Sequence, residues 1–413
     1  MKIAIVGSGI AGLGAAWLLS RHHEVVLFES QKRLGGHTHT HRVTQQGRDY
    51  CVDTGFIVFN PENYPLLGRM FDELGVTSQA TTMGFSVHDG ASGLEYNATN
   101  LNAMFCQRRN LLSPRFLRMV REILRFYREC PSLLDEVGDG PTLGDYLSAN
   151  GYSQLFVRDH LVPMACALWS SPSGRILDFP AKYLVRFMAN HRMLQVQGRP
   201  GWRVVTGGSS AYIDALQSNW QATVRLGTAV HSITRNADAV VLASSAGEES
   251  FDQVVLACHA DESLALLADA SGEEASVLGA MRFQDNDTVL HTDARLLPRR
   301  RAAWAAWNAY VPAEPEAHCT VSYCMNLLQS IDSPEPFIVT LNRSKDIDPG
   351  KILARMNYRH PVYDHASVAA QGRRGDINGV RRTWFAGAYW GFGFHEDGLR
   401  SGVDVARSLG VSW

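Results

Sequence analysis

Hydrophobic and polar positions at the start of the chain follow the pattern of a nucleotide-binding unit. Residues 3–6 are all apolar, which is typical of a strand buried in a parallel sheet. Residues 12–21 carry apolar side chains at helical spacing, and residues 24–29 form a second strand-like run. A strand, a glycine turn, a helix and a strand in this order predict a mononucleotide-binding βαβ unit.

Two later regions differ from this one. Residues 101–194 are predicted to be mainly helical, with strong helical runs at 116–128 and 155–168. Further strand-like pieces and one last helix are predicted at residues 223–258, 289–291, 319–323, 337–341, 383–387 and 398–409. We therefore expect an α/β protein whose nucleotide-binding domain is assembled from three separated pieces of chain.

Composition and charge narrow the class of protein. The 413 residues are 45% hydrophobic and 19% charged with a net charge of −2, so nucleic acid is not expected as a partner. The seven cysteines are scattered without a CxxC pair, which argues against a disulfide framework and favours a reducing, cytoplasmic location. Neither a secretory leader nor a run of about 18 apolar residues is seen, so we expect at most contact with a membrane surface.

The hexapeptide from Gly7 to Gly12 is the first motif with a chemical meaning. Gly7 allows a tight turn, Gly9 lets a pyrophosphate approach the backbone, and Gly12 lets the helix pack on the strand. The helix N-terminus then offers N–H groups and a positive dipole end to the phosphates. Glu29, at the end of the second strand, is placed to accept hydrogen bonds from ribose hydroxyls and disfavours the 2′-phosphate of NADP.

A second glycine pair stands in the run from Arg33 to His37, and the far end of the chain carries Phe-Ala-Gly at 385–387 and glycine, serine and glycine at 398, 401 and 402. In these features the chain resembles the superfamily of FAD-dependent amine oxidases and phytoene desaturases. The resemblance implies FAD as cofactor, held by a discontinuous Rossmann-type domain like that of glutathione reductase. It implies the following cofactor-binding residues: Gly7, Ser8, Gly9, Ala11, Gly12, Glu29, Ser30, Arg33, Gly35, Gly36, His37, Thr38, Val230, Gly387, Gly398, Leu399 and Ser401.

Within this superfamily, the runs 35–40 and 394–401 are similar to a bacterial subgroup described as predicted FAD/NAD-binding proteins. Genes of that subgroup often lie near genes for lipid methyltransferases similar to cyclopropane-fatty-acid synthases. The resemblance implies a lipid-like small molecule, an acyl chain, as substrate.

The chain departs from the amine oxidases at two positions. His37 stands where those enzymes commonly have an arginine after the paired glycines. Where they have a lysine that holds a water near flavin N5, the strand 288–291 offers His291, a candidate base or water-binding group and equally a candidate structural histidine. Tyr389 and Trp390, between the two C-terminal FAD turns, are the other candidate catalytic residues.

Two further patterns have more than one interpretation. His37, His39 and His41 alternate as metal ligands sometimes do, but no carboxylate or cysteine cluster is near them, so no metal site is predicted. Residues 115–128 place five arginines opposite an apolar face. This pattern indicates a core-facing helix with a solvated basic face, or a helix that docks on a membrane surface or an acyl carboxylate.

These observations lead to one expected function and several alternatives. We expect an FAD-binding domain of residues 1–60, 200–265 and 375–413, and a substrate domain of residues 61–199 and 266–374 that combines a mixed sheet with helices. The expected reaction is dehydrogenation of a lipid-like substrate by hydride transfer to flavin N5. The alternatives are isomerisation without net oxidation, amine oxidation, and a non-catalytic FAD-binding partner protein.

Overall fold

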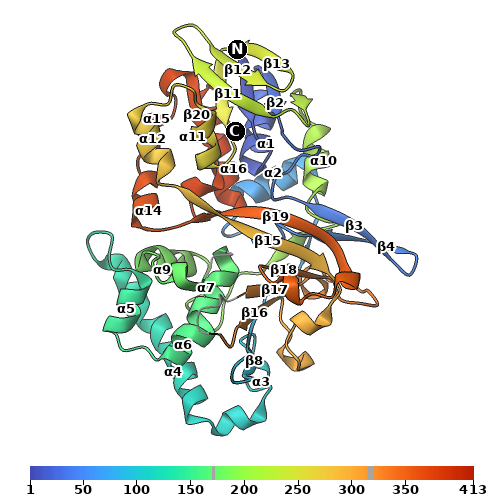
Figure 1. Cartoon of the computed structure of the whole chain (residues 1–413), viewed down its shortest axis with the longest axis vertical. Helices are drawn as coiled ribbons and strands as arrows, with labels where there is room; N and C mark the ends of the chain where they lie inside the picture. Colours follow the sequence, from blue (N-terminus) through green and yellow to red (C-terminus); the bar gives the residue numbers. More distant parts are fainter. Residues whose placement is uncertain (170–172, 315–319) are drawn as a thin grey trace.

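The computed structural model describes residues 1–169, 173–314 and 320–413. Its upper part in Figure 1 is built on a five-stranded parallel sheet. In spatial order the strands are β10 (Thr223–Arg225), β2 (Glu24–Phe28), β1 (Lys2–Val6), β14 (Gln253–Leu256) and β20 (Thr383–Phe385). Segments from three distant parts of the chain therefore lie side by side in one sheet.

The two faces of this sheet pack against different layers because successive side chains of a strand alternate. Ile3 and Ile5 face the fully buried helix α1 (Ile10–Leu19), against which α16 (His395–Ser408) also packs. Ala4 and Val6 face an antiparallel layer of three strands, together with two short helices. These elements are β11 (Val230–Arg235), β12 (Val240–Ser244), β13 (Gly247–Phe251), α11 (Ala260–Leu266) and α12 (Gly272–Gly279).

An ion-pair network joins this antiparallel layer to α12 and to the loop before it. The side chain of Arg235 is fully buried, and its Nε donates to Asp269 Oδ1 at 2.9 Å. Its Nη2 donates to Glu274 Oε2 at 2.8 Å. Since a buried charge without a partner is costly, each member of this network depends on the others.

A seven-stranded sheet crosses the middle of the molecule below the parallel sheet (Figure 1). Its order is β19 (Ile352–Val362), β15 (Arg282–His291), β18 (Ile338–Leu341), β17 (Thr320–Cys324), β16 (Trp307–Val311), β7 (Phe85–Asp89) and β8 (Glu95–Asn97). Neighbours are antiparallel except for β16 and β7. A hairpin of β3 (Thr40–Gln45) and β4 (Arg48–Asp53) projects to one side.

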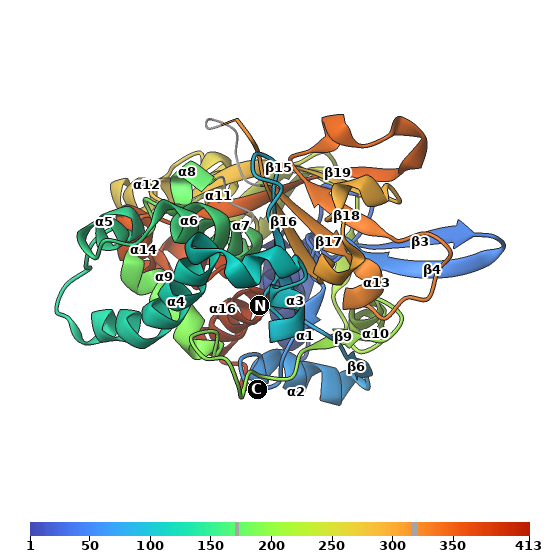
Figure 2. The same ribbon diagram turned by 90° about the horizontal axis from the view of Figure 1, so that it is seen from below.

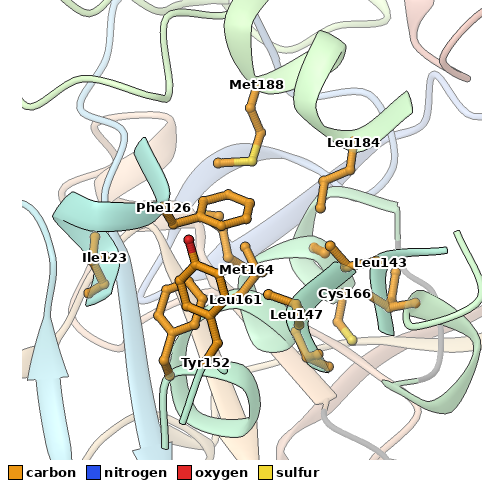
Figure 3. Packing of buried hydrophobic residues seen from close by; sticks show 14 of the residues in the cluster. Ile123, Phe126, Leu143, Leu147, Tyr152, Leu161, Met164, Cys166, Leu184 and Met188 are labelled. Atoms are coloured by element: carbon orange, nitrogen blue, oxygen red, sulfur yellow. The ribbon is translucent and has the colours of Figure 1, made fainter. Parts of the chain in front are cut away.

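A helical block forms the lower part of the molecule. It contains α3 (Leu101–Met104), α4 (Pro114–Glu129), α5 (Leu143–Ala149), α6 (Gln154–Phe156), α7 (Val162–Trp169) and α9 (Ala181–Asn190). Figure 3 shows side chains of α4, α5, α7 and α9 meeting in a common core, among them Phe126, Leu147, Met164 and Met188. α4 begins where it does because the Ser113 hydroxyl accepts from the Phe116 N–H at 3.3 Å and Pro114 follows it.

The predicted fold class is confirmed, since a parallel Rossmann-type sheet is joined to a mixed sheet and helices. The last helix begins at His395 rather than near residue 398, because Asp397 accepts from the Phe394 N–H and caps its first turn. The strand expected at 319–323 corresponds to β17, although Cys319 lies outside the described residues. No helix of the described chain is long and apolar enough to cross a membrane. The domain limits expected from the sequence stay predictions.

Candidate active site

A cavity of about 1490 Å³ lies between the parallel sheet, the seven-stranded sheet and the helical block. One arm begins at the carboxyl ends of β1 and β2, where parallel sheets commonly bind ligands. The other arm ends among α3, α4, α7 and α9. Both arms belong to one continuous cavity.

The glycine turn between β1 and α1 shapes the first arm. A Cβ on Gly12 would lie 2.0 Å from the carbonyl oxygen of Gly7, so the start of α1 packs directly on the turn. A Cβ on Gly9 would meet no heavy atom within 4 Å. Because Gly9 lines the cavity at the N-terminus of α1, this space is open to a phosphate and to the first N–H groups of the helix.

Glu29 is fixed at the end of β2. Its carboxylate accepts from the N–H and the hydroxyl of Ser8 at 3.0 and 2.5 Å, and from the Gln31 N–H at 2.8 Å. Val230 and the two residues before it line the cavity beside this carboxylate, and the Thr228 N–H donates to the Glu29 carbonyl at 2.8 Å. The arrangement provides a carboxylate for ribose hydroxyls and, beside it, a wall against which a nucleobase can lie.

Arg33 holds the second glycine pair in place. Its guanidinium donates to the carbonyl oxygens of Gly36 and Thr38 at 2.8 and 3.1 Å. Gly35 and Gly36 adopt positive φ values of 113° and 56°, which favour glycine. This turn therefore lies against the first glycine turn, with its backbone facing the cavity.

Three histidines from different parts of the chain line the middle of the cavity. The ring of His37 lies 5.2 Å from the ring of His360, and the ring of His395 stacks on Phe56 at 3.7 Å. Burial lowers the pKa of His395 to about 3, that of His360 to about 4, and that of His37 well below its usual value. All three imidazoles are therefore neutral at pH 7. His37 Nε2 is buried and has no hydrogen-bond partner among the described residues.

These features fit a bound dinucleotide such as FAD. The open space at Gly9 accepts a phosphate, and Glu29 stands where a ribose would lie. His37, which lines the cavity, has a buried Nε2 without a hydrogen-bond partner among the described residues, so a bound group could supply one. The N-terminus of α16 reaches the cavity through Phe394 and His395, so its dipole favours negative charge there.

The second arm is mainly apolar. Its far part is lined by Met104, Val120, Ile123, Leu124, Met164, Leu168, Phe187, Met193 and Val196. Among the described lining residues, the carboxylates are Glu29 and Glu262, both in the first arm, and no lysine contributes. Arg199 stands at the far end of this arm, near His160 and Tyr127. Burial and, to a smaller extent, the Arg199 charge lower the pKa of His160. Burial raises the pKa of Tyr127, and the Arg199 charge partly offsets that rise.

Most residues predicted to bind the cofactor line this cavity. They are Gly7, Ser8, Gly9, Ala11, Glu29, Ser30, Arg33, Gly35, Gly36, His37, Val230 and Gly387. Tyr389, a candidate catalytic residue, lines it as well.

The other predicted cofactor residues lie behind the lining. Ser401 Oγ accepts from the Gly387 N–H at 2.8 Å and donates to the Gly398 carbonyl at 2.6 Å, so it positions the turn. Leu399 is buried against α1, and Gly12 packs on the first turn. The Thr38 hydroxyl is hydrogen-bonded to His395 Nε2 at 2.9 Å.

Two of the candidate catalytic residues, His291 and Trp390, do not line the cavity. The His291 side chain is buried outside the cavity lining, with Nε2 bonded to Thr340 Oγ1 at 2.7 Å and Nδ1 accepting from the Asp293 N–H at 3.0 Å. It is a structural histidine. Trp390 also lies outside the lining, with the Arg374 guanidinium 5.6 Å from its ring. Their positions in the sequence could not show whether the side chains of His291 and Trp390 face the cavity or the protein interior.

The histidines at 37, 39 and 41 do not act as a group. The rings of His39 and His41 lie 4.0 Å apart, while His37 turns into the cavity before β3 begins. Among the described residues no group of three or more histidine, cysteine, aspartate or glutamate side chains could hold a metal ion.

His395, His360 and Tyr358 are among the polar cavity residues that sequence reasoning missed. His395 sits directly before the acidic first turn of α16, and this position could have identified it. His360 and Tyr358 come from β19, which carried no motif, and only the pairing of β19 with β15 brings them to the site.

Comparison with known proteins was made for sequence and for structure. The family model described as flavin containing amine oxidoreductase matches residues 10–276. An L-amino acid oxidase of Cerastes cerastes is 45% identical over 47 residues, which are 11% of this chain and 9% of that protein. The flavin-dependent L-tryptophan oxidase RebO of Lentzea aerocolonigenes is 46% identical over 55 residues, 13% of this chain and 12% of that protein. The chain thus matches only a small part of the length of these relatives.

Solved structures match over nearly the whole chain. A CLA-producing fatty acid isomerase from P. acnes superposes with a TM-score of 0.69 at 17% identity, covering 99% of this chain and 98% of that one. Cyclohexylamine oxidase from Brevibacterium oxydans gives a TM-score of 0.69 at 15% identity, with coverage of 99% and 98%. At such identities the likeness establishes the fold.

Proposed function

The chain belongs to the family of flavin-containing amine oxidoreductases, whose cofactor is FAD, and we propose that it dehydrogenates a lipid-like fatty acyl substrate. The observation that carries this proposal is the apolar second arm of the cavity. The subgroup resemblance of residues 35–40 and 394–401 supports the same substrate class.

The lining of the second arm suits a hydrocarbon chain. Methionine, leucine, isoleucine, valine and phenylalanine side chains from α3, α4, α7 and α9 enclose it, and such side chains favour a ligand by removing apolar surface from water. Arg199, at the far end, offers a fixed cation to a carboxylate or phosphate head group. The polarity of the arm thus matches that of an amphiphile with an anionic head.

The same lining argues against a charged amine. No described carboxylate of the second arm is available to pair with an ammonium group, and no described lysine lines the cavity. The three central imidazoles are neutral at pH 7, and the charged groups beside them, Glu262 and Arg359, are paired with each other. An uncharged C–H bond is a better match to this environment than a cation.

Bound FAD supplies the hydride acceptor that the amino acids lack. The protein contributes orientation: Ser401 holds the Gly387 turn, and the His395 ring is fixed by stacking on Phe56. Dehydrogenation takes one hydrogen from each of two adjacent carbons, one as a hydride and the other as a proton, so the site would need the bound cofactor for the first and a proton acceptor for the second. His37 Nε2 is available for a hydrogen bond at the cavity wall.

Isomerisation without net oxidation is the second candidate, because the CLA-producing fatty acid isomerase has a similar fold. The two reactions differ in the mass of the product. Dehydrogenation removes two hydrogens from the acyl chain, whereas isomerisation leaves the mass of the product and the oxidation state of the flavin unchanged over one turnover.

Anaerobic titration tests the proposal. The flavin absorbance of the holoprotein is expected to bleach on addition of a long-chain fatty acid or phospholipid and to remain unchanged with amines and amino acids. The Val120→Trp variant fills the second arm and is expected to lower kcat/KM for long chains at least about tenfold. Leu353→Trp, at a position that is 41% exposed on β19 and outside the lining, is the control. Bleaching by amines alone, or equal behaviour of the two variants, would contradict the proposal.

A further inference from the structure

The second arm of the cavity opens to solvent at the helical end of the molecule. Three apolar side chains both line the cavity and are strongly exposed: Leu101 (77%), Leu124 (50%) and Val196 (69%). They come from α3, α4 and the segment after α9, with the exposed Arg199 beside Val196 in sequence. These four residues form the mouth of the arm.

Further exposed leucines lie next to this mouth in the chain. Leu111 and Leu112 end the 3-10 turn Arg108–Leu112 between α3 and α4, and Leu112 is 88% exposed. Leu117 is two turns before Leu124 and therefore on the same face of α4. Figure 2, which views the molecule from below, shows α3 and α4 turned toward the viewer. Exposed apolar side chains gathered in this way mark a contact surface.

The same segment is strongly basic. Residues 101–129 contain seven arginines and two glutamates, whereas the whole chain has a net charge of −2. The two glutamates are already paired, Glu122 with Arg118 and Glu129 with Arg125 and Arg128. Arg109, Arg115 and Arg121 are exposed and form no ion pair with a described carboxylate. The surface thus has unneutralised positive charge beside exposed apolar groups.

We propose that this surface, made of α3, Arg108–Leu112, α4 and Val196, docks on a bilayer containing anionic phospholipid. Leucines that enter the interface together with arginines that meet lipid phosphates are the combination that holds proteins at such membranes. The mouth then opens onto the acyl chains, so a lipid substrate passes into the cavity without crossing water. The proposal deepens the proposed function, but vesicle binding is measured without turnover, so the two can fail separately.

Charge complementarity selects this occupant over the alternatives. If the basic face of α4 were only in contact with water, the exposed leucines beside it, Leu111, Leu112 and Leu124, would have no function. A second copy of the chain would bring seven more arginines against the first seven, which is repulsive. An anionic bilayer satisfies both the charge and the apolar groups.

Flotation of the holoprotein with vesicles tests the proposal. Binding is expected to vesicles of phosphatidylglycerol and phosphatidylcholine, to be weak with phosphatidylcholine alone, and to fall with salt. The triple variant Arg109→Gln, Arg115→Gln, Arg121→Gln is expected to bind roughly a hundredfold more weakly. The double variant Leu111→Asp, Leu112→Asp is expected to lose binding, whereas Leu353→Asp, Val380→Asp, at positions 41% and 45% exposed elsewhere, is expected to keep it.

Activity separates docking from chemistry. Neither Leu111 nor Leu112 lines the cavity, so their double variant is expected to keep its flavin bleaching with a monomeric fatty acid and to lose it with lipid in vesicles. Absence of wild-type flotation with anionic vesicles would overturn the proposal. Equal flotation of the two aspartate double variants, or a wild-type dimer dissociated only by the Leu111 and Leu112 changes, would overturn it as well.

Discussion

Gly9 and Gly12 stand three residues apart in the same turn, yet their substitution by alanine should affect different properties. Gly9→Ala should weaken cofactor binding, and Gly12→Ala should destabilise the fold. A Cβ on Gly9 meets nothing within 4 Å in the protein and enters the space that a cofactor phosphate would occupy. Its backbone angles, φ −65° and ψ 175°, are open to alanine. A displaced phosphate loses at least one charge-assisted hydrogen bond to the start of α1, about 1.5–3 kcal/mol. The Gly9→Ala apoprotein should therefore fold normally and bind FAD roughly ten- to hundredfold more weakly.

Gly12→Ala provides the contrast. The added Cβ would lie 2.0 Å from the Gly7 carbonyl oxygen, so α1 must move away from the turn. We expect a loss of at least about 3 kcal/mol in the free energy of unfolding of the apoprotein. Urea unfolding of both apoproteins and FAD titration by flavin fluorescence separate the two effects. The reasoning is refuted if Gly9→Ala binds FAD like wild type, or if it unfolds as easily as Gly12→Ala.

Three further predictions follow from buried polar groups. Burial lowers the pKa of His160 from 6.5 to about 3, so between these values only the unfolded chain binds this proton and the free energy of unfolding should fall below pH 6.5, by about 2 kcal/mol at pH 5 for this residue. In urea unfolding, His160→Phe should therefore lose about 2 kcal/mol less than wild type between pH 7 and pH 5, and an equal loss in the two proteins would contradict the prediction. Arg235→Met should lower the free energy of unfolding by roughly 3–5 kcal/mol, because Glu274 is left buried and unpaired, and the double variant with Glu274→Met should recover much of it; no recovery would contradict the ion-pair explanation. Ser401→Ala should cost about 1–3 kcal/mol in urea and weaken FAD retention, since the Gly387 N–H loses its acceptor; unchanged retention would show that Ser401 does not position the turn.

The cofactor half of the site was predictable because its chemistry depends on local sequence. A turn such as Gly7 to Gly12 has the same geometry wherever a strand precedes it and a helix follows it. Glu29 could be placed for the same reason, since it ends the next strand. Most of these residues do line the cavity.

The rest depended on contacts that sequence spacing does not show. His291 lies at the end of the long strand β15, and its ring is hydrogen-bonded to Thr340 on the neighbouring strand β18 and does not line the cavity. His360 reaches the site only through the register of β19 on β15. The apolar arm is enclosed by helices whose apolar spacing is the same as that of helices in a filled hydrophobic core. The cavity between them could therefore not be predicted from the sequence pattern.

The parallel sheet has a consequence for how the newly made chain acquires its cofactor. Ile3 pairs with Gln253 and Val254 with Thr383, so the first strand leaves the ribosome long before β14, its neighbour on one side, and β20 exist. Pairings of such separation form slowly, because the intervening loop must be closed first. The first glycine turn is therefore synthesised early but can hold FAD firmly only after β14, β20 and α16 have joined it. Flavin loading should mark completion of the fold, and nascent chains arrested before residue 383 should remain colourless.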